Sequence, residues 1–282
     1  MNSETKILIV GLGLIGGSYA KGLTQKGYKV YGLDTNKSSV EFAIKNNYVV
    51  DGYTKCNETS LSDKDIIILG IYPSFVASWI KDNQKYLKEN ALITDVCGIK
   101  CSYLFKVKEI LRSDLTYIPH HPMAGRELSG IENSNEKIFQ GANFIVTPTE
   151  GDDKEKVSII KNIGQELGFK NIVELTPEKH DEMIGFLSQL THVIAVSLMT
   201  SRECTSYAAY TGDSFRDLTR IAHINENMWS ELFLENKEFL ISEIDTFIKQ
   251  VEKIKQTLID DDEESLKEIM RLSTDRRSYF DK

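Results

Sequence analysis

The feature that most constrains the fold is a short apolar run followed at once by three spaced glycines. Residues 6–10 have the composition of a buried strand, the glycine loop 11–16 follows directly, and the next residues read as a helix that ends at Gly27. In such a unit the glycines permit a tight turn, let a phosphate approach the backbone, and let helix and strand pack closely. The helix N-terminus adds N–H donors. The start of the chain therefore predicts a site for a phosphate-bearing ligand.

The second strand candidate indicates which ligand this is. Asp34 follows residues 29–33, at the point where a carboxylate accepts hydrogen bonds from an adenosine ribose diol. A carboxylate here repels a 2′-phosphate, so NAD is favoured over NADP. The alternative is a glycine-rich turn with no ligand. The predicted cofactor-binding residues are Gly11, Leu12, Gly13, Leu14, Ile15, Gly16 and Asp34.

The rest of the chain alternates strand and helix and then becomes helical. Further strand candidates lie at residues 65–69, 91–95, 116–118, 143–148 and 171–174, with helical stretches such as 75–86 and 103–111 between them. This alternation predicts a parallel, doubly wound sheet that ends with the last two of these strands. From Thr176 and Pro177, a capping hydroxyl followed by proline, only helices are expected. We predict an α/β protein with a Rossmann domain at 1–170 and an all-helical domain at 171–282.

Composition excludes several classes of partner. The net charge is −8 and no long basic run occurs, which argues against nucleic acid or an anionic membrane surface. The apolar stretch at residues 7–17 is too short to span a bilayer, and no basic signal region precedes it, so a cytoplasmic protein is expected. The four cysteines form no Cys-x-x-Cys pair and have no histidines at zinc-ligand spacing, so reduced thiols and no metal are expected.

Two adjacent histidines follow the strand candidate at 116–118. His120 and His121 stand between Pro119 and Pro122. Ligands of open α/β sheets bind at the carboxyl ends of strands, and neutral imidazole can take or give a proton near pH 7. His121 is the better candidate for a proton acceptor, and His120 is expected to be a hydrogen-bonded structural residue. A structural role for His121 is the alternative.

Two further sets of residues share spacing that favours a site. On a long helix from Pro177, Asp181, Ser188 and His192 are spaced by seven and four and would share one face, although Asp181 and His192, about 16 Å apart along the axis, are too far apart to pair. A core histidine is the alternative for His192. Arg216 and Arg220 are four apart, with His223 three further on, and would present one basic face to a dianionic substrate. A solvated charged face is the alternative.

Four segments, in order along nearly the whole chain, resemble the prephenate and arogenate dehydrogenases of tyrosine biosynthesis. They are residues 95–100, 121–125, 144–148, and 215–222 with Met228 and Trp229. The resemblance implies a Rossmann domain, a helical dimerisation domain, a homodimer, and NAD(P)-linked oxidative decarboxylation of a small dicarboxylate. In prephenate, hydride leaves ring C4 as its hydroxyl loses a proton, and loss of carbon dioxide makes the ring aromatic.

The resemblance also implies roles for single residues. It makes His121 the proton acceptor, places His192 near the substrate, and puts Asp181 in a supporting ionic network. Arg220 is the first choice for a substrate carboxylate and Arg216 the second. Glu127 matches an acidic position at the mouth of the pocket, although a surface glutamate is equally consistent with the sequence. Trp229 is expected to be a packing residue.

One departure and three alternatives remain. Many members of the family have serine where this chain has Gly98, after Cys97, so no role is transferred to that position. Prephenate dehydrogenase, monofunctional because the chain leaves no room for a further domain, is the predicted activity. Arogenate dehydrogenase is the first alternative and a β-hydroxyacid type of dehydrogenase, which relies on a catalytic lysine, is the second. A catalytically silent NAD-binding sensor is the third.

Overall fold

A parallel sheet of six strands organises the first part of the chain. The computed structural model describes residues 2–125 and 128–281, which form two compact units, Met1–Asn236 and Lys237–Lys282. The sheet has the order β3-β2-β1-β4-β5-β6 with all neighbours parallel. The strands are β1 (Lys6–Val10), β2 (Lys29–Leu33), β3 (Asp51–Tyr53), β4 (Ile66–Leu69), β5 (Leu92–Asp95) and β6 (Thr116–Tyr117). Only β3 lies outside the strands predicted from the sequence, and the predicted doubly wound sheet is confirmed.

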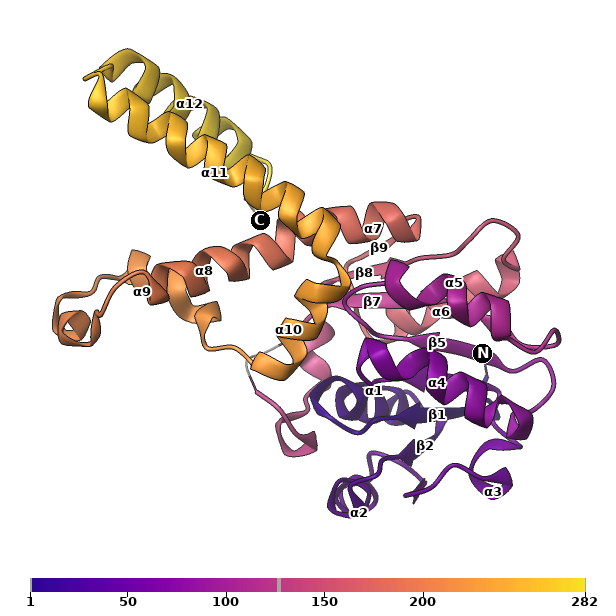
Figure 1. The fold of residues 1–282 in the computed structure, drawn as a ribbon. Helices are drawn as coiled ribbons and strands as arrows, with labels where there is room; N and C mark the ends of the chain where they lie inside the picture. Colours follow the sequence, from indigo (N-terminus) through magenta and orange to yellow (C-terminus); the bar gives the residue numbers. More distant parts are fainter. Residues whose placement is uncertain (1, 126–127, 282) are drawn as a thin grey trace. The chain divides into compact units, whose positions relative to one another are not determined.

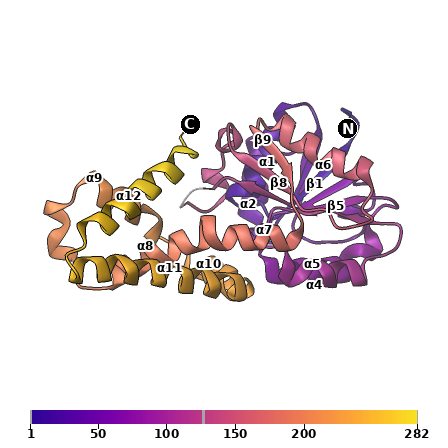
Figure 2. The ribbon, with the colours of Figure 1, turned by 90° about the horizontal axis from the view of Figure 1, so that it is seen from above.

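Helices cover both faces of this sheet, which is why its strands are almost wholly apolar. Ile7 and Ile9 of β1 pack with residues of α1, α2 and α6, whereas Leu8 and Val10 pack with residues of α4 and α5 (Figures 1 and 2). The helices are α1 (Leu14–Gln25), α2 (Lys37–Lys45), α3 (Glu58–Leu61), α4 (Pro73–Asn83), α5 (Cys101–Ile110) and α6 (Lys154–Glu166). The strand order reverses between β1 and β4, so ligands are expected beyond the carboxyl ends of these two strands.

A second, three-stranded sheet corrects one prediction. It consists of β7 (His120–Met123), β8 (Asn143–Val146) and β9 (Asn171–Glu174), in that order. The last two strands were predicted to extend the large sheet, but β8 instead pairs antiparallel with β7 and parallel with β9. Pro122 lacks an N–H group and is tolerated in β7 because β7 is an edge strand. Because β9 belongs to this sheet, the strands continue past the predicted domain boundary at residue 170.

The helices that follow include an irregular turn. As predicted, α7 (Pro177–Ile184) begins after Thr176, whose hydroxyl accepts from the N–H of Lys179 at 3.2 Å. A π-helical turn, Gly185–Leu190, then joins α7 to α8 (Thr191–Thr200), so the prediction of one continuous α-helix is wrong at this point. After α8 come α9 (Asp213–Thr219) and α10 (Glu226–Glu235).

The stretch Pro177–Thr200 is also notable for its hydropathy. Among the described residues it is the one helical stretch long and apolar enough, by length and composition, to cross a membrane. Its mean hydropathy is 1.5, and 28% of the apolar window is buried inside the protein.

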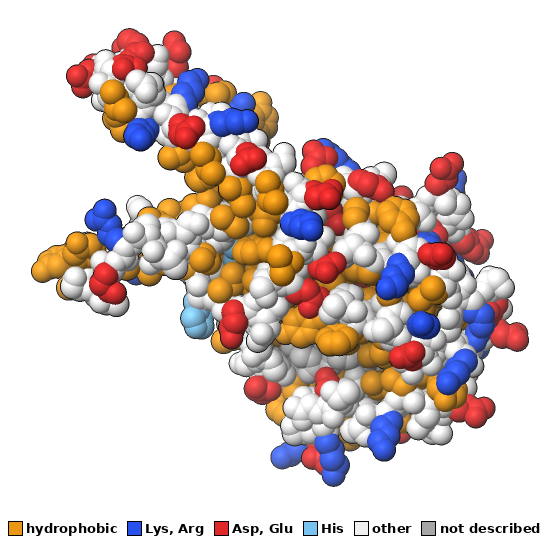
Figure 3. Space-filling view, viewed as in Figure 1, with side chains coloured by type: hydrophobic (Ala, Val, Ile, Leu, Met, Phe, Trp, Pro, Cys, Tyr) orange, Lys and Arg blue, Asp and Glu red, His pale blue; other side chains and the backbone are white. Residues whose placement is uncertain are grey.

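The second compact unit is a helical hairpin. It consists of α11 (Lys237–Ile259) and α12 (Glu263–Ser278). Asp262 caps α12 by accepting from the N–H of Ser265 at 3.0 Å, and Glu263 and Glu264 lie in the first turn, where acidic side chains stabilise a helix. The hairpin exposes many large apolar side chains, some of which are visible in the space-filling view (Figure 3). They include Ile241, Phe247, Ile248, Val251, Ile254, Leu258, Met270 and Leu272.

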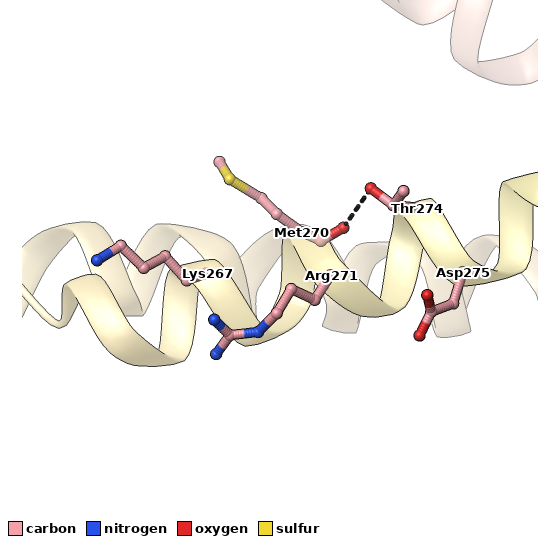
Figure 4. Close-up of a pocket in the computed structure, with 5 residues that line it drawn as sticks. All are labelled: Lys267, Met270, Arg271, Thr274 and Asp275. Carbon is pink, nitrogen blue, oxygen red and sulfur yellow. Dashed lines mark hydrogen bonds between the residues drawn. The ribbon is translucent and has the colours of Figure 1, made fainter.

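A shallow hollow lies on α12. Figure 4 shows its lining residues, Lys267, Met270, Arg271, Thr274 and Asp275, all from this one helix. The Thr274 hydroxyl donates to the carbonyl of Met270 at 3.0 Å, so it is satisfied within the helix. The hollow is a groove between neighbouring side chains rather than a cleft between elements.

Candidate active site

The glycine loop has the geometry needed for a dinucleotide. Gly11 has a φ of 88°, and a Cβ there would lie 2.3 Å from the carbonyl oxygen of Gly70. A Cβ at Gly16 would lie 1.8 Å from the carbonyl oxygen of Gly11, so helix α1 can approach β1 only with glycine here. Gly13, the N-cap of α1, makes no side-chain cap bond, and a Cβ there would meet nothing within 4 Å. The open space at this helix N-terminus fits a pyrophosphate.

Asp34 is held beside this loop. One of its carboxylate oxygens accepts from the N–H of Leu12 at 2.7 Å, and the other accepts from the N–H of Asn36 at 2.8 Å. These bonds fix the carboxylate at the end of β2, next to the glycine loop. Leu12 and Leu14 are buried, and Ile15 packs against the core, so these three residues contribute backbone rather than side chains to the loop. Together the loop and Asp34 fit NAD, with the carboxylate facing a ribose diol.

A line of hydrogen bonds, which we call the histidine relay, connects β7 to α7. Nδ1 of His121 lies 2.9 Å from Nε2 of His180, and Nδ1 of His180 lies 2.7 Å from Oδ1 of Asp181. The Asp181 carboxylate also accepts from the backbone N–H of Lys100 at 2.9 and 3.0 Å and of Cys101 at 2.7 Å. These donors lie at the start of α5, where N–H groups have no partner within the helix.

The partners in the relay determine where its protons lie. An ionised carboxylate only accepts, so His180 carries its proton on Nδ1 and, when neutral, has a lone pair on Nε2. Nδ1 of His121 must then donate to that lone pair, which leaves the lone pair of neutral His121 on Nε2. A Cβ built on Gly98 would lie 3.8 Å from this Nε2, in ordinary contact, so the nitrogen faces the space beside Gly98. The relay therefore presents a proton acceptor at that point.

Burial and charge keep this acceptor neutral. The pKa of His121 lies well below its ordinary value. Burial is the largest cause, followed by the neighbouring His180 and Lys100. Burial also lowers the pKa of His180, and outweighs the hydrogen bond to Asp181 that raises it. Burial would raise the pKa of Asp181, but the hydrogen bond from His180 and the backbone donors lower it. The favoured state is an ionised aspartate and two neutral imidazoles.

A buried ion pair lies next to the histidine relay and contacts the backbone of β7. Lys100 and Asp95 have fully buried side chains, and Nζ of Lys100 lies 2.6 Å from Oδ1 of Asp95. The same Nζ donates to the backbone carbonyl of His120 at 2.8 Å. Tyr103 and Tyr117 donate their hydroxyls to the same carboxylate. Burial would raise the pKa of Asp95, but Lys100 lowers it, so the carboxylate stays ionised.

His120 has separate surroundings from its neighbour, because successive residues of a strand point to opposite faces. Its ring is fully buried, with Nε2 2.8 Å from the hydroxyl of Tyr19 and Nδ1 2.6 Å from the hydroxyl of Thr94. It also stacks on Phe144, with ring centroids 4.6 Å apart. Burial lowers the pKa of His120 to about 3. The ring is therefore neutral and packed into the core.

His192 lies in a different environment from Asp181. Nδ1 of His192 donates to the backbone carbonyl of Ser188 at 2.9 Å, because a carbonyl can only accept. The half-buried ring stacks on Trp229, with centroids 3.6 Å apart. Asp181, by contrast, is buried and faces the start of α5. The predicted shared face of Asp181, Ser188 and His192 assumed a regular α-helix, which the π-helical turn interrupts.

The predicted substrate-binding residues lie in more exposed parts of the chain. Arg216 is exposed, pairs with Asp213 at 2.5 Å and donates to the carbonyl of Thr211 at 3.0 Å. Arg220 is exposed in the 3₁₀ turn Arg220–Ala222, which packs against α8. Glu127 lies outside the described residues.

Sequence reasoning missed His180, Lys100 and Asp95 as parts of this site. His180 precedes Asp181 directly, and no spacing pattern in the sequence relates it to His121. Lys100 and Asp95 belong to a recognised segment, but only the fold shows that one contacts both the sheet and α7. Among residues 2–125 and 128–281, no group of three or more His, Cys, Asp or Glu could hold a metal ion.

A doubly wound sheet with a dinucleotide loop, joined to helices that complete a buried histidine relay, defines a two-domain oxidoreductase of the Rossmann type. Two family models cover most of the chain. "Prephenate dehydrogenase, nucleotide-binding domain" matches residues 19–173, and "Prephenate dehydrogenase, dimerization domain" matches residues 176–272. The chain belongs to the prephenate dehydrogenase family.

Individual relatives agree with this assignment. Prephenate dehydrogenase of Bacillus subtilis (strain 168) is 28% identical over 96% of this chain and 75% of the relative. Cyclohexadienyl dehydrogenase of Zymomonas mobilis is 27% identical over 96% of this chain and 94% of the relative. The crystal structure of prephenate dehydrogenase from A. aeolicus, in complex with hydroxyphenyl propionate and NAD+, has a TM-score of 0.90 and 30% identity, and covers 99% of both chains.

Proposed function

We propose that this protein catalyses the NAD-dependent oxidative decarboxylation of prephenate to 4-hydroxyphenylpyruvate. The observation that carries the proposal is the lone pair on Nε2 of His121, which the relay through His180 and Asp181 directs toward the space beside Gly98. The reaction needs an acceptor for one hydroxyl proton in a site poor in water. Membership of the prephenate dehydrogenase family supplies the substrate class.

His121 takes the proton in this mechanism. Nε2 accepts the hydrogen of the ring hydroxyl as hydride leaves C4, and NAD, when bound, supplies the hydride acceptor. As His121 becomes an imidazolium, its Nδ1–H bond to His180 strengthens, and the Asp181 carboxylate stabilises the positive charge. The prephenate dianion loses hydride and carbon dioxide, and the product monoanion keeps the proton on its phenol oxygen. His121 therefore returns the proton it took. Asp181 acts through His180 as a positioning residue.

The remaining residues bind and orient the substrate. Arg220 is proposed to hold a substrate carboxylate, with Arg216 as a second cation, because guanidinium binds carboxylate in a bidentate manner. His192, held by Ser188 and stacked on Trp229, is proposed to line the substrate side of the site. Glu127, outside the described residues, is kept as a proposed substrate-binding residue.

NAD rather than NADP is the proposed cofactor. The Asp34 carboxylate is fixed beside the glycine loop by two backbone N–H groups and would repel a 2′-phosphate. The solved relative from A. aeolicus was crystallised with NAD+, which supports the same choice.

We also propose a homodimer located in the cytoplasm. The exposed apolar side chains of α11, among them Ile248 and Val251, form a surface that a second copy would cover. The match to a dimerization domain at residues 176–272 supports this. The apolar stretch Pro177–Thr200 carries the buried Asp181 of the relay, which favours a role in the fold over a membrane span. Light scattering should give twice the monomer mass of 32.0 kDa.

The decisive experiment is NADH formation at 340 nm with prephenate and with arogenate, each repeated with NADP. Turnover of prephenate with NAD is expected, and His121→Asn should reduce kcat by about 10²- to 10⁴-fold while NAD binding is kept. Faster turnover of arogenate than of prephenate would favour arogenate as the substrate. The similarity to a cyclohexadienyl dehydrogenase is the reason for including this compound. No turnover of either compound would refute the proposed function.

A further inference from the structure

Two buried amides join α10 to the π-helical turn. Nδ2 of Asn236 donates to Oε1 of Gln189 at 2.7 Å and to the backbone carbonyl of Asp181 at 3.0 Å. Nε2 of Gln189 donates to the carbonyl of Leu232 at 2.8 Å. Gln189 is only 1% exposed and Asn236 only 4%. Buried amides are stable only when hydrogen-bonded, so this pair is satisfied in the observed arrangement of the two segments.

The pair acts at the point where the backbone departs from the α-helix. Gln189 lies inside the π-helical turn Gly185–Leu190, and the Asp181 carbonyl lies just before it. Such turns are rare and usually occur singly within α-helices, often at functional sites. An apolar segment of this kind would otherwise form a regular helix. The Asn236 and Gln189 bonds are made at this turn.

The turn changes which way the later residues face. A π-helical turn adds one residue relative to an α-helix, and one residue corresponds to a rotation of about 100°. Without the turn, Asp181 and His192 would share one face. With it, Asp181 faces the start of α5 and His192 faces Trp229. The turn thus allows one helical segment to complete the histidine relay through Asp181 and to direct His192 toward Trp229.

Helix α10 and its C-cap residue Asn236 carry the matching contacts on one side. Trp229, Leu232 and Asn236 are spaced by three and four, so they lie along the same side of the helix. Trp229 stacks on His192, the Leu232 carbonyl accepts from Gln189, and Asn236 donates to the Asp181 carbonyl. A fourth contact ties α10 to the nucleotide-binding part, because Glu231 accepts from the N–H of Ser74 at 2.8 Å, at the start of α4. Helix α10 and Asn236 therefore contact α7, the π-helical turn, α8 and α4.

We propose that Gln189 and Asn236 are positioning residues of the dehydrogenase: they hold the π-helical turn, and through it the orientation of Asp181 in the relay and of His192. The inference rests on the proposed function for its kinetic consequence. Its structural consequence, a single tautomer for His121 and His180, stands independently of turnover.

The test compares single and double substitutions. Asn236→Leu leaves Oε1 of the buried Gln189 without its donor, although Nε2 keeps the Leu232 carbonyl, and should lower the Tm. The double variant Gln189→Leu/Asn236→Leu removes both amides and should recover most of that Tm, because replacing both partners with apolar groups is close to neutral. Asn227→Leu, which changes an exposed amide on the same helix, is the matched control.

The readouts separate positioning from stability. In the double variant we expect kcat to fall about 10- to 100-fold with the KM for NAD unchanged, since a small misplacement of reacting groups has effects of that size. Nitrogen-15 NMR of the histidine rings should show the parent with Nδ1–H tautomers at His121 and His180 and the double variant with a mixture. If the double variant does not fold, Gln189→Met, which keeps the Asn236 to Asp181 bond, is measured in the same way and should show the same changes more weakly.

The outcomes are distinct. Recovery of Tm together with parental kcat and parental ring tautomers would show that the amides are merely structural and would overturn the inference. If the double variant cannot be studied, a parental kcat and parental ring tautomers in Gln189→Met would also overturn the inference. If the unsubstituted protein turns over no cyclohexadienyl substrate, the proposed function fails, and the NMR comparison still decides whether the amides hold the relay.

Discussion

The substitution Asp181→Asn tests the proton arrangement of the relay most directly. The two carboxylate oxygens of Asp181 have different partners: Oδ1 accepts from His180 and Lys100, and Oδ2 accepts from Lys100 and Cys101. An amide has the same shape but only one oxygen. If that oxygen takes the Oδ2 position, both backbone donors stay satisfied and the NH₂ group faces Nδ1 of His180.

This orientation reverses the relay. The new NH₂ donor requires a lone pair on Nδ1 of His180, which moves that proton to Nε2. His180 then donates to Nδ1 of His121, and neutral His121 carries its proton on Nε2, where the substrate hydroxyl needs an acceptor. The opposite amide orientation would keep the parental tautomers but leave the N–H of Cys101 facing an NH₂ group, which costs about 1–3 kcal/mol.

The expected loss follows from this geometry. General-base catalysis contributes about 10²- to 10⁴-fold, and a carboxylate-to-amide change that reverses an imidazole tautomer costs about 10⁴-fold in kcat in the serine proteases. We therefore expect Asp181→Asn to reduce kcat by about 10²- to 10⁴-fold. The Asp34 contacts are untouched, so the Kd for NAD should be unchanged.

The assay is NADH formation at 340 nm at saturating prephenate, with the Kd for NAD measured by fluorescence and ring tautomers by nitrogen-15 NMR. Asp275→Asn, an exposed aspartate on α12, is the control and should retain parental kcat. A loss of less than tenfold in Asp181→Asn, with both rings still protonated on Nδ1, would refute the proton arrangement.

Three further predictions concern stability, cofactor choice and substrate binding. Burial lowers the pKa values of His120, His121 and His180, so the unfolded chain takes up protons first as pH falls; stability present above pH 6.5 should decrease between pH 7.5 and 5.5, by about 1.4 kcal/mol from His120 alone, and an unchanged free energy of unfolding by urea would contradict this. Asp34→Ser should raise kcat/KM for NADP relative to NAD by at least about tenfold, because a carboxylate repels a 2′-phosphate, whereas an unaltered ratio would remove Asp34 from cofactor selection. Arg220→Ala should raise the KM for prephenate by about tenfold or more and leave the KM for NAD within twofold, and equal changes in both would indicate a structural role.

Local patterns in the sequence were sufficient for the nucleotide-binding part. The strand, glycine loop, helix and Asp34 are adjacent in the chain, so their spacing alone predicts how they fold. His121 could also be chosen, because it follows a strand candidate and stands between prolines. These features depend on interactions within a few dozen residues.

The parts that sequence reasoning missed depend on distant partners. His180 is 59 residues from His121, and its neighbour Asp181 is 80 residues from Cys101. The π-helical turn contains Gln189, whose partner Asn236 lies 47 residues further along. The three-stranded sheet needs β7 to pair with β8 across residues that show no strand pattern between them. None of these contacts has a periodic signal, so only the folded chain reveals them.

Lys100 joins two parts of the site that are far apart in the sequence. Its ammonium group holds the His120 carbonyl, and its backbone N–H holds the Asp181 carboxylate, so one residue of the β5 to α5 connection contacts both β7 and α7. The glycine loop and Asp34, by contrast, lie in the β1-α1-β2 unit and make no hydrogen bond with α7 among those described. A partly folded protein in which α7 has come away from the sheet would therefore still bind nucleotide, but its His121 would have no fixed tautomer. Nucleotide binding and turnover thus depend on different parts of the fold.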